Sequence, residues 1–180
     1  MIVQSSLTSE INVRLLTDLG WARGKVAVAA GQTFADHLEQ NDGVLRLRDA
    51  TIPSRRQSSP FLVLRCDAVR IAITEEMGIH RRRSGLSSAG QAATLLLETY
   101  AVTGLVDLGI ERRLSDVFTE RHAFIRVQQA TLYTEARDGQ FDELADFSDV
   151  YVNVKRVRAA CEAEGYNAAA DAQSQRVAQD

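Results

Sequence analysis

The sequence predicts a mainly β protein made of two tandem small, five-stranded, partly open β-barrels, each with one short helix. Two observations lead to this prediction. Residues 24–52 align with residues 104–132 without a gap, at a constant offset of 80 positions. Within the aligned segments, apolar and polar residues alternate in the way that is typical of half-buried strands. We interpret the alignment as an internal duplication.

Identities and shared apolar positions support this alignment. The identical pairs are Gly24/Gly104, Val26/Val106, Asp36/Asp116, Arg46/Arg126, Ala50/Ala130 and Thr51/Thr131. Apolar residues also align with apolar residues at Val28/Leu108, Phe34/Leu114, Leu38/Phe118, Val44/Phe124, Leu45/Ile125, Leu47/Val127 and Ile52/Leu132. After a change of length, LRCDAVRI resembles VNVKRVRA, so the match extends over most of both copies.

The first copy begins with a hairpin followed by a short helix. The segments INVRLLT and WARGKVAVA are joined by Asp18-Leu19-Gly20, which is typical of a β-hairpin. In TFADHLEQN the residues fit one short helix, and Thr33 with Asp36 approximates a capping box. By the alignment, we expect Leu38 and Phe118 to pack on the two barrel cores.

Three further strands complete the predicted barrel. VLRLRDATI alternates, which places Arg46 and Arg48 on the face opposite Leu45 and Leu47. PFLVLRCDAVRIAIT supplies two short strands that bend between Cys66 and Ala68. Closing five strands into a barrel removes exposed sheet edges. QAATLLLETY alone is compatible with a helix, but its alignment with the first strand of copy one predicts a strand.

Four segments follow from this interpretation. We expect a first repeat at residues 1–76, a flexible basic linker at 77–91, a second repeat at 92–160 and a frayed or disordered tail at 161–180. The linker is rich in Gly, Ser and Arg and has no periodicity. The tail has much Ala, Gln and Asp but no apolar face.

Composition and cysteine usage indicate a cytoplasmic protein. No apolar run reaches the roughly 18 residues of a membrane span, and no basic region followed by an apolar region marks a secretory signal. Cys66 and Cys161 lie far apart and do not form a C-x-x-C pair. We therefore expect reduced cysteines, with Cys66 as a small buried residue, and neither a disulfide nor a zinc site.

The patterns that carry chemistry favour structural roles. Asp36 and Asp116 each fall in the first turn of a predicted helix, where a carboxylate stabilises exposed N–H groups. Gly24 and Gly104 are typical of a strand bulge or a close backbone approach. The three histidines occupy positions that do not match between the copies, and neither a nucleophile elbow nor a phosphate-binding loop is present. We expect no catalysis, no cofactor, no metal and no small-molecule substrate.

Charge points to a binding role instead. Residues 1–85 carry 12 basic and 9 acidic side chains, whereas residues 86–180 carry 9 and 15. The basic candidates for partner contact are Arg55, Arg56, Arg81, Arg82 and Arg83. The equivalent connection in the second copy, residues 134–149, is longer and acidic. Its candidates for partner contact are Phe141, Asp142, Glu143 and Asp146. Phe141, Leu144 and Phe147 have helical spacing, which predicts an amphipathic turn there. Equivalent segments of opposite charge favour a protein partner or self-association.

Two resemblances accompany this interpretation. Gly104-Leu105-Val106 with Arg113-Leu114-Ser115-Asp116 resembles a group of uncharacterised small bacterial β-domains, which implies no function. The layout also resembles the Sm-like small barrel, with Leu64–Ile73 as its closing segment, although Cys66 stands where a glycine is typical. The Asp-x-hydrophobic-x-Asn pattern that holds a base in Sm-like proteins is absent from its usual place. We therefore expect a non-catalytic binding or assembly module; the alternative is an Sm-like protein that binds single-stranded RNA or DNA.

Overall fold

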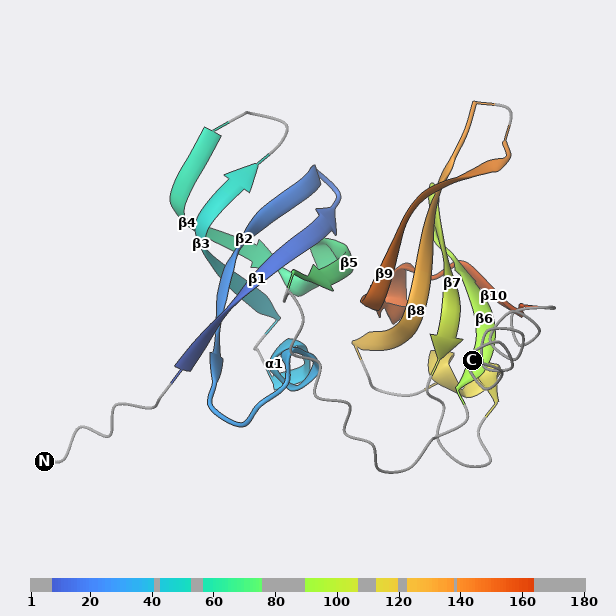
Figure 1. Cartoon of the computed structure of the whole chain (residues 1–180), viewed down its shortest axis with the longest axis horizontal. Helices are drawn as coiled ribbons and strands as arrows, with labels where there is room; N and C mark the ends of the chain where they lie inside the picture. The colour runs from blue at the N-terminus through green and yellow to red at the C-terminus, as the bar shows by residue number, and fades with distance from the viewer. Residues whose placement is uncertain are drawn as a thin grey trace, which may run out of the picture. The chain divides into compact units, whose positions relative to one another are not determined.

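The protein is mainly β, as the sequence predicts. The computed structural model describes residues 8–40, 43–52, 57–75, 90–106, 113–119, 123–137 and 139–163. The ten strands of these residues form one open antiparallel sheet, in the order β10-β6-β7-β8-β9-β5-β1-β2-β3-β4. Figure 1 shows the strands with the labels used below.

The chain divides into two compact units. Unit 1 consists of Met1–Ser84, Arg121–Arg126 and Val150–Lys155, and unit 2 consists of Gly85–Glu120, Val127–Asp149 and Arg156–Asp180. The sequence alignment placed two short segments in the second repeat that belong to unit 1, namely Arg121–Arg126 and Val150–Lys155.

Unit 1 contains the strands of the first copy in the expected positions. They are β1 (Thr8–Thr17), β2 (Gly20–Ala29), β3 (Val44–Ile52), β4 (Gln57–Arg65) and β5 (Val69–Thr74). Their order is β5-β1-β2-β3-β4. Helix α1 (Phe34–Gln40) follows β2, and the 3-10 helix η1 (Cys66–Ala68) makes the predicted bend between β4 and β5.

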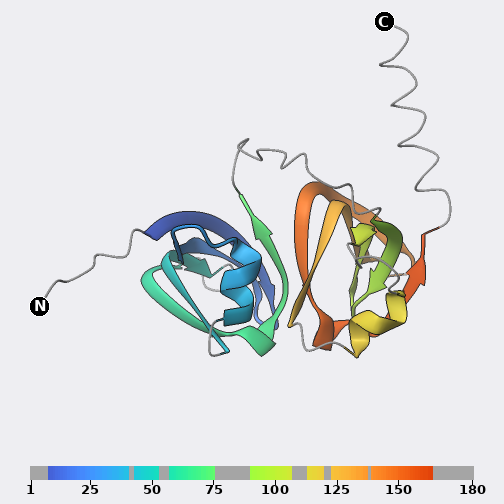
Figure 2. The ribbon, with the colours of Figure 1, turned by 90° about the horizontal axis from the view of Figure 1, so that it is seen from below.

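The core of unit 1 lies on the inner face of these strands. Alternation buries one side chain in two, as in β3, where Leu45 and Leu47 are buried while Arg46 and Arg48 are exposed. Phe34 and Leu38 join the core from α1, which lies across one end of the curled strands (Figure 2). Phe124 and Tyr151 belong to the same core, and the Tyr151 ring meets the Phe34 ring edge-on at 5.3 Å between centroids.

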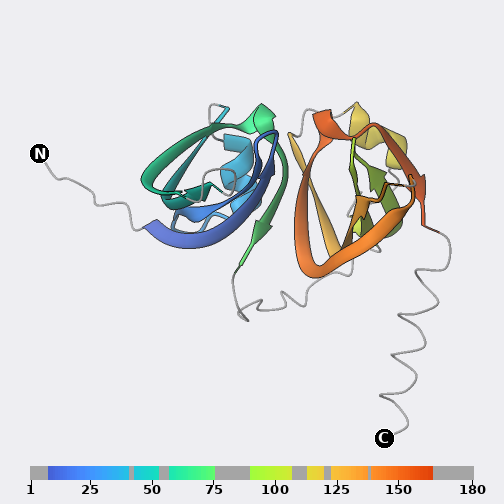
Figure 3. The same ribbon diagram turned by 90° about the horizontal axis from the view of Figure 1, so that it is seen from above.

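Unit 2 contains the other five strands. Its strands are β6 (Gln91–Leu96), β7 (Tyr100–Val106), β8 (Phe124–Glu135), β9 (Phe141–Asn153) and β10 (Ala159–Glu162), in the order β10-β6-β7-β8-β9. The first residues of β8 and the last residues of β9 lie in unit 1. The 3-10 helices η2 (Leu114–Phe118) and η3 (Val154–Arg156) interrupt the strands, and Figure 3 shows β6–β10 as a curled sheet. The prediction of a strand at QAATLLLETY is confirmed.

The two units share a β-bulge at equivalent positions. In unit 1, Arg23 pairs with Thr51, and the register then shifts so that Lys25 pairs with Arg48. In unit 2, Thr103 pairs with Thr131 and Leu105 with Gln128, each 80 positions later. Asp49 and Gln129, also 80 positions apart, have positive φ angles of 48° and 49°. Gly24 and Gly104 lie at the two shifts, which confirms the predicted bulge.

The helical segments differ between the units. Leu38 is 2% exposed, but Phe118 is 43% exposed, so the prediction that Phe118 packs on a core is wrong. In an α-helix, Phe34 and Leu38 are one turn apart and share a face. Leu114 and Phe118 are also four residues apart, but they lie on a 3-10 helix with three residues per turn, which separates them to different faces.

Candidate functional site

The outer strand of unit 1 exposes large apolar side chains. β4 comes last in the strand order, and its side chains alternate. Leu62 and Leu64 pack against the core, whereas Phe61 and Val63 are 50% and 51% exposed. An edge strand presents backbone N–H and C=O groups that a further strand can pair with. Apolar side chains on such an edge are typical of a binding surface or an aggregation hazard.

Two arginines lie beside these apolar side chains. Arg46 pairs with Val63 and Arg48 with Phe61 across the β3–β4 ladder, so all four side chains share the outer face. We call this surface, formed by Arg46, Arg48, Phe61 and Val63, the β4 patch. A pocket of about 190 Å³ opens in it, lined by Ala27, His37, Arg46, Arg48 and Phe61.

The electrostatics of the β4 patch suit a carboxylate. The guanidinium group of Arg48 lies 3.3 Å from the Glu10 carboxylate, and Lys25 on β2 contacts Asp49 at 2.9 Å. The Asp49 carboxylate raises the pKa of Lys25 by hydrogen bonding and by its charge. Burial lowers the pKa of His37, so this side chain favours its neutral form. The patch therefore combines exposed apolar surface with the Arg46 guanidinium and with Arg48, whose charge the Glu10 carboxylate already meets in part, so it suits a partner that adds one carboxylate.

The sequence placed the two arginines on the outer face of their strand but did not mark them as partner-binding candidates, and Phe61 and Val63 were missed. The signal was present in PFLVLR, because strict alternation in a strand exposes every second residue. Pro60 was a second signal, since a proline within a strand is found essentially only at sheet edges or bulges.

The acidic candidates occupy a strand rather than a loop. Residues 141–149, called the acidic segment below, form the first part of β9, so the predicted amphipathic helical turn is wrong. Strand alternation places Leu144 on the face opposite Phe141 and Phe147. Phe141 is 40% and Leu144 50% exposed, and Asp142 and Glu143 are exposed as well. Asp146, also exposed, accepts a hydrogen bond of 2.7 Å from the Thr131 hydroxyl.

The basic candidates cannot be compared with this strand. Arg55, Arg56, Arg81, Arg82 and Arg83 lie outside the described residues. Of the predicted partner-binding residues, the structure therefore places Phe141, Asp142, Glu143 and Asp146 together on one strand.

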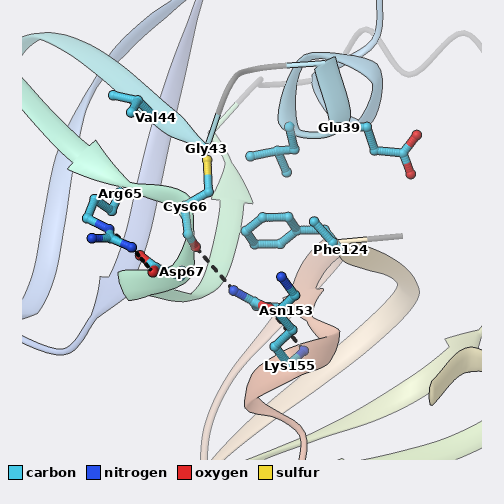
Figure 4. Close-up of a pocket in the computed structure, with 11 residues that line it drawn as sticks. Glu39, Gly43, Val44, Arg65, Cys66, Asp67, Phe124, Asn153 and Lys155 are labelled. Atoms are coloured by element: carbon cyan, nitrogen blue, oxygen red, sulfur yellow. Dashed lines mark hydrogen bonds and ion pairs between the residues drawn. The ribbon is translucent and has the colours of Figure 1, made fainter. Parts of the chain in front are cut away.

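A second hollow in unit 1 lies beside Cys66. This pocket of about 570 Å³ is lined by residues that all belong to unit 1: Leu38, Glu39, Gly43, Val44, Arg65, Cys66, Asp67, Ala123, Phe124, Asn153 and Lys155. Figure 4 shows the Arg65 guanidinium paired with the Asp67 carboxylate. The Asn153 side-chain amide donates to the backbone carbonyl oxygens of Cys66 and Val69, at 3.1 and 2.8 Å. Asn153 thus fixes the backbone at η1.

Cys66 has the character of a buried structural thiol, as predicted. It is free and 7% exposed. Burial, and secondarily the Asp67 carboxylate, raises the pKa of the thiol. A raised pKa reduces the thiolate fraction at neutral pH, and the thiolate is the nucleophile and metal ligand. The environment of Cys66 therefore does not activate it.

The shared acidic pair caps helices. The Thr33 backbone N–H and hydroxyl both donate to Asp36, at 2.8 and 2.7 Å, and these bonds lower the pKa of the carboxyl group. In unit 2, the Arg113 backbone N–H donates to Asp116 at 2.9 Å. The predicted helix-capping role of both residues is confirmed.

Within the described ranges, no group of three or more His, Cys, Asp or Glu side chains could hold a metal ion. His80 and His122 lie outside those ranges. In the same part of the chain, no helix has the length and apolar character that crossing a membrane requires.

Comparisons with protein-family models, curated proteins and solved structures found no match to this chain. The two resemblances drawn from the sequence therefore stay predictions.

Proposed function

We propose that this protein is a non-catalytic binding and assembly module that takes protein partners on the β4 patch. The observation that carries the proposal is the half-exposure of Phe61 and Val63 on the last strand of unit 1. Full burial of such a side chain is worth about 1.5–3 kcal/mol, and because each of these two is already half buried, about half of this amount is left to gain for each. A partner that covers them recovers part of this free energy.

The chemistry of the patch specifies the partner. An edge strand accepts an extended peptide by strand addition, in which backbone hydrogen bonds give affinity and alternate side chains give specificity. Here the alternate positions offer apolar surface from Phe61 and Val63, and positive charge from Arg46 and Arg48. The proposed partner is therefore an extended protein segment in which carboxylates accompany apolar side chains.

A duplicated architecture supports an assembly role. We propose that the chain consists of two tandem repeats of one small, partly open barrel. The strand orders β5-β1-β2-β3-β4 and β10-β6-β7-β8-β9 correspond, and so do the bulges at Gly24 and Gly104. Such a repeat places β4 and β9 at equivalent positions in the two strand orders, with different side chains.

Single-stranded nucleic acid is the alternative partner. Phe61 beside Arg46 and Arg48 offers stacking and phosphate contact, the two elements of single-strand binding. Two features favour protein instead. Aromatic residues make up 6% of the chain, which leaves few stacking platforms. The Glu10 and Asp49 carboxylates also pair with cations of this face, which weakens its attraction for a polyanion.

Titrations monitored by backbone NMR test the proposal. The probes are an extended peptide of alternating apolar and acidic residues, the same peptide with lysine in place of each acid, and oligo-dT. We expect the acidic peptide to shift the resonances of β3 and β4, and Phe61→Ser to abolish this binding. The matched control is Leu19→Ser, which removes an apolar side chain that is 72% exposed in the β1–β2 turn. Shifts with oligo-dT alone, with a steep salt dependence, would establish the alternative.

A further inference from the structure

The geometry points to one occupant of the β4 patch: we propose that it is the acidic segment of β9 from a second copy of this chain. This inference rests on the proposed function and names its partner. It follows from three independent features of the described residues.

The first feature is where the exposed apolar side chains lie. Six large hydrophobic residues of the described part of the chain are exposed, and four of them are Phe61, Val63, Phe141 and Leu144. These four belong to β4 and to the acidic segment. Exposed apolar surface thus concentrates on the two strands that the proposal brings together.

The second feature is complementary charge. β4 carries no acidic residue, and the arginines of the β4 patch lie on its neighbour β3. The acidic segment carries four carboxylates, from Asp142, Glu143, Asp146 and Asp149, and no basic residue. The first three of these residues are exposed. By strand alternation, Asp142 and Asp146 share the face of Leu144, and Glu143 shares the face of Phe141, so each exposed apolar side chain has an exposed carboxylate on its own face.

The third feature is position in the sheet. β4 is the last strand of the sheet, and β9 lies between β8 and β5. β9 pairs with β5 at Tyr151 and Val152, which lie beyond the acidic segment. Both surfaces are thus at the margins of their units, where a further strand can add.

Charge also determines the kind of contact. Two acidic segments repel each other, and so do two β4 patches, which disfavours pairing of identical surfaces. A contact between the β4 patch of one copy and the acidic segment of another leaves the first copy with an unused acidic segment and the second with an unused β4 patch. Such a heterologous contact builds rings if it closes and open chains if it does not. The inferred assembly is therefore head to tail.

Sedimentation velocity of the full chain tests the inference. We expect the wild-type protein to form species larger than a dimer as its concentration rises, and less so at about 500 mM than at about 50 mM salt, because the Debye length shrinks about threefold over this range. Phe61→Ser and Leu144→Ser should each leave a monomer, whereas the control Leu19→Ser should associate like the wild type. Circular dichroism confirms that each variant is folded.

A mixture of the two monomeric variants gives the decisive result. Phe61→Ser keeps an intact acidic segment and Leu144→Ser keeps an intact β4 patch. Mixed in equal amounts, they should therefore form a dimer and nothing larger. A wild type that remains monomeric at every concentration and both salt levels overturns the inference, as does a Leu144→Ser variant that still associates. If the acidic peptide binds the β4 patch while the wild type stays monomeric, only the second-copy inference fails; if the peptide does not bind either, the proposed function fails as well.

Discussion

Unit 1 and unit 2 have the same bulge between their second and third strands, but Leu38 in the helix of unit 1 is buried whereas Phe118, 80 positions later, is exposed. The bulges agree in their residue pairs and in the positive φ angles of Asp49 and Gln129. The helical segments differ, since Leu38 lies on an α-helix and Phe118 on a 3-10 helix. The backbone geometry of the bulge is thus the same in both units, whereas the packing of these two aligned side chains differs.

The largest expected effect tests this difference directly. Leu38→Ala should lower the free energy of unfolding by about 2–5 kcal/mol, because it leaves a cavity in a packed core. Phe118→Ala should lower it by less, about 1 kcal/mol, because the side chain is 43% exposed and has less burial to lose. Chemical denaturation of both variants measures the two values. Equal losses would mean that Phe118 is buried in solution and that the helical segments are alike.

The bulge glycines give the next effect. A Cβ atom at Gly104 would lie 2.6 Å from the Gln128 carbonyl oxygen and 2.7 Å from a Val127 methyl carbon. At Gly24 the corresponding nearest atoms are 3.0 and 3.1 Å away. Both alanine substitutions should therefore destabilise the protein, within about 1–3 kcal/mol for overpacking, and Gly104→Ala by the larger amount. Thermal unfolding of the two variants checks the order, and a neutral Gly104→Ala would show that the bulge is not tightly packed.

A smaller loss of stability should distinguish the first residues of α1 and η2. The Thr33 hydroxyl accepts a hydrogen bond from the Asp36 backbone N–H at 3.2 Å, whereas Arg113 at the equivalent position has no hydroxyl. Thr33→Ala should cost about 1 kcal/mol of stability, as the loss of an N-cap does. Thr33→Ser should retain most of it, and Arg113→Ala should cost little. A Thr33→Ala variant as stable as Thr33→Ser would remove the capping role.

The smallest effect is a pH dependence present in unit 1. Burial lowers the pKa of His37 below its ordinary value of 6.5. Below pH 6.5 the unfolded chain binds a proton that the folded chain does not, so stability should fall as the pH drops from 6.5 through the folded-state pKa. The capping bonds of Asp36 lower its pKa from 3.8, so its loss of stability lies in a separate, more acidic window. His37→Gln should remove the first step and keep the second. NMR titration that places the His37 pKa at or above 6.5 would contradict the sign.

Much of this fold was predictable because it depends on local alternation. The β1–β2 turn, the alternation of β3 and the bend at Cys66 follow from residue types at fixed spacing. The exposure of Phe118 was not predictable, because an apolar residue four positions after another fits an α-helix equally well, and the 3-10 geometry is set by tertiary context. The acidic segment was misread for the same reason, since Phe141, Leu144 and Phe147 fit a helical period as well as they fit β9. Of the candidate site, the sequence indicated the acidic residues and the outward direction of Arg46 and Arg48, but neither a binding role for these two arginines nor which strand would be last in the sheet.

The composition of the unit 1 core has a consequence for how the protein is made. Phe34 packs against Tyr151, which the ribosome adds more than a hundred residues later. Because domains fold as the chain emerges from its N-terminus, unit 1 reaches its complete core only after residues 150–155 have been synthesised. Nascent chains that stop in the middle of the sequence lack Phe124 and Tyr151, and they expose the apolar surface that these two side chains cover. The part of the protein that is translated first therefore completes its core among the last.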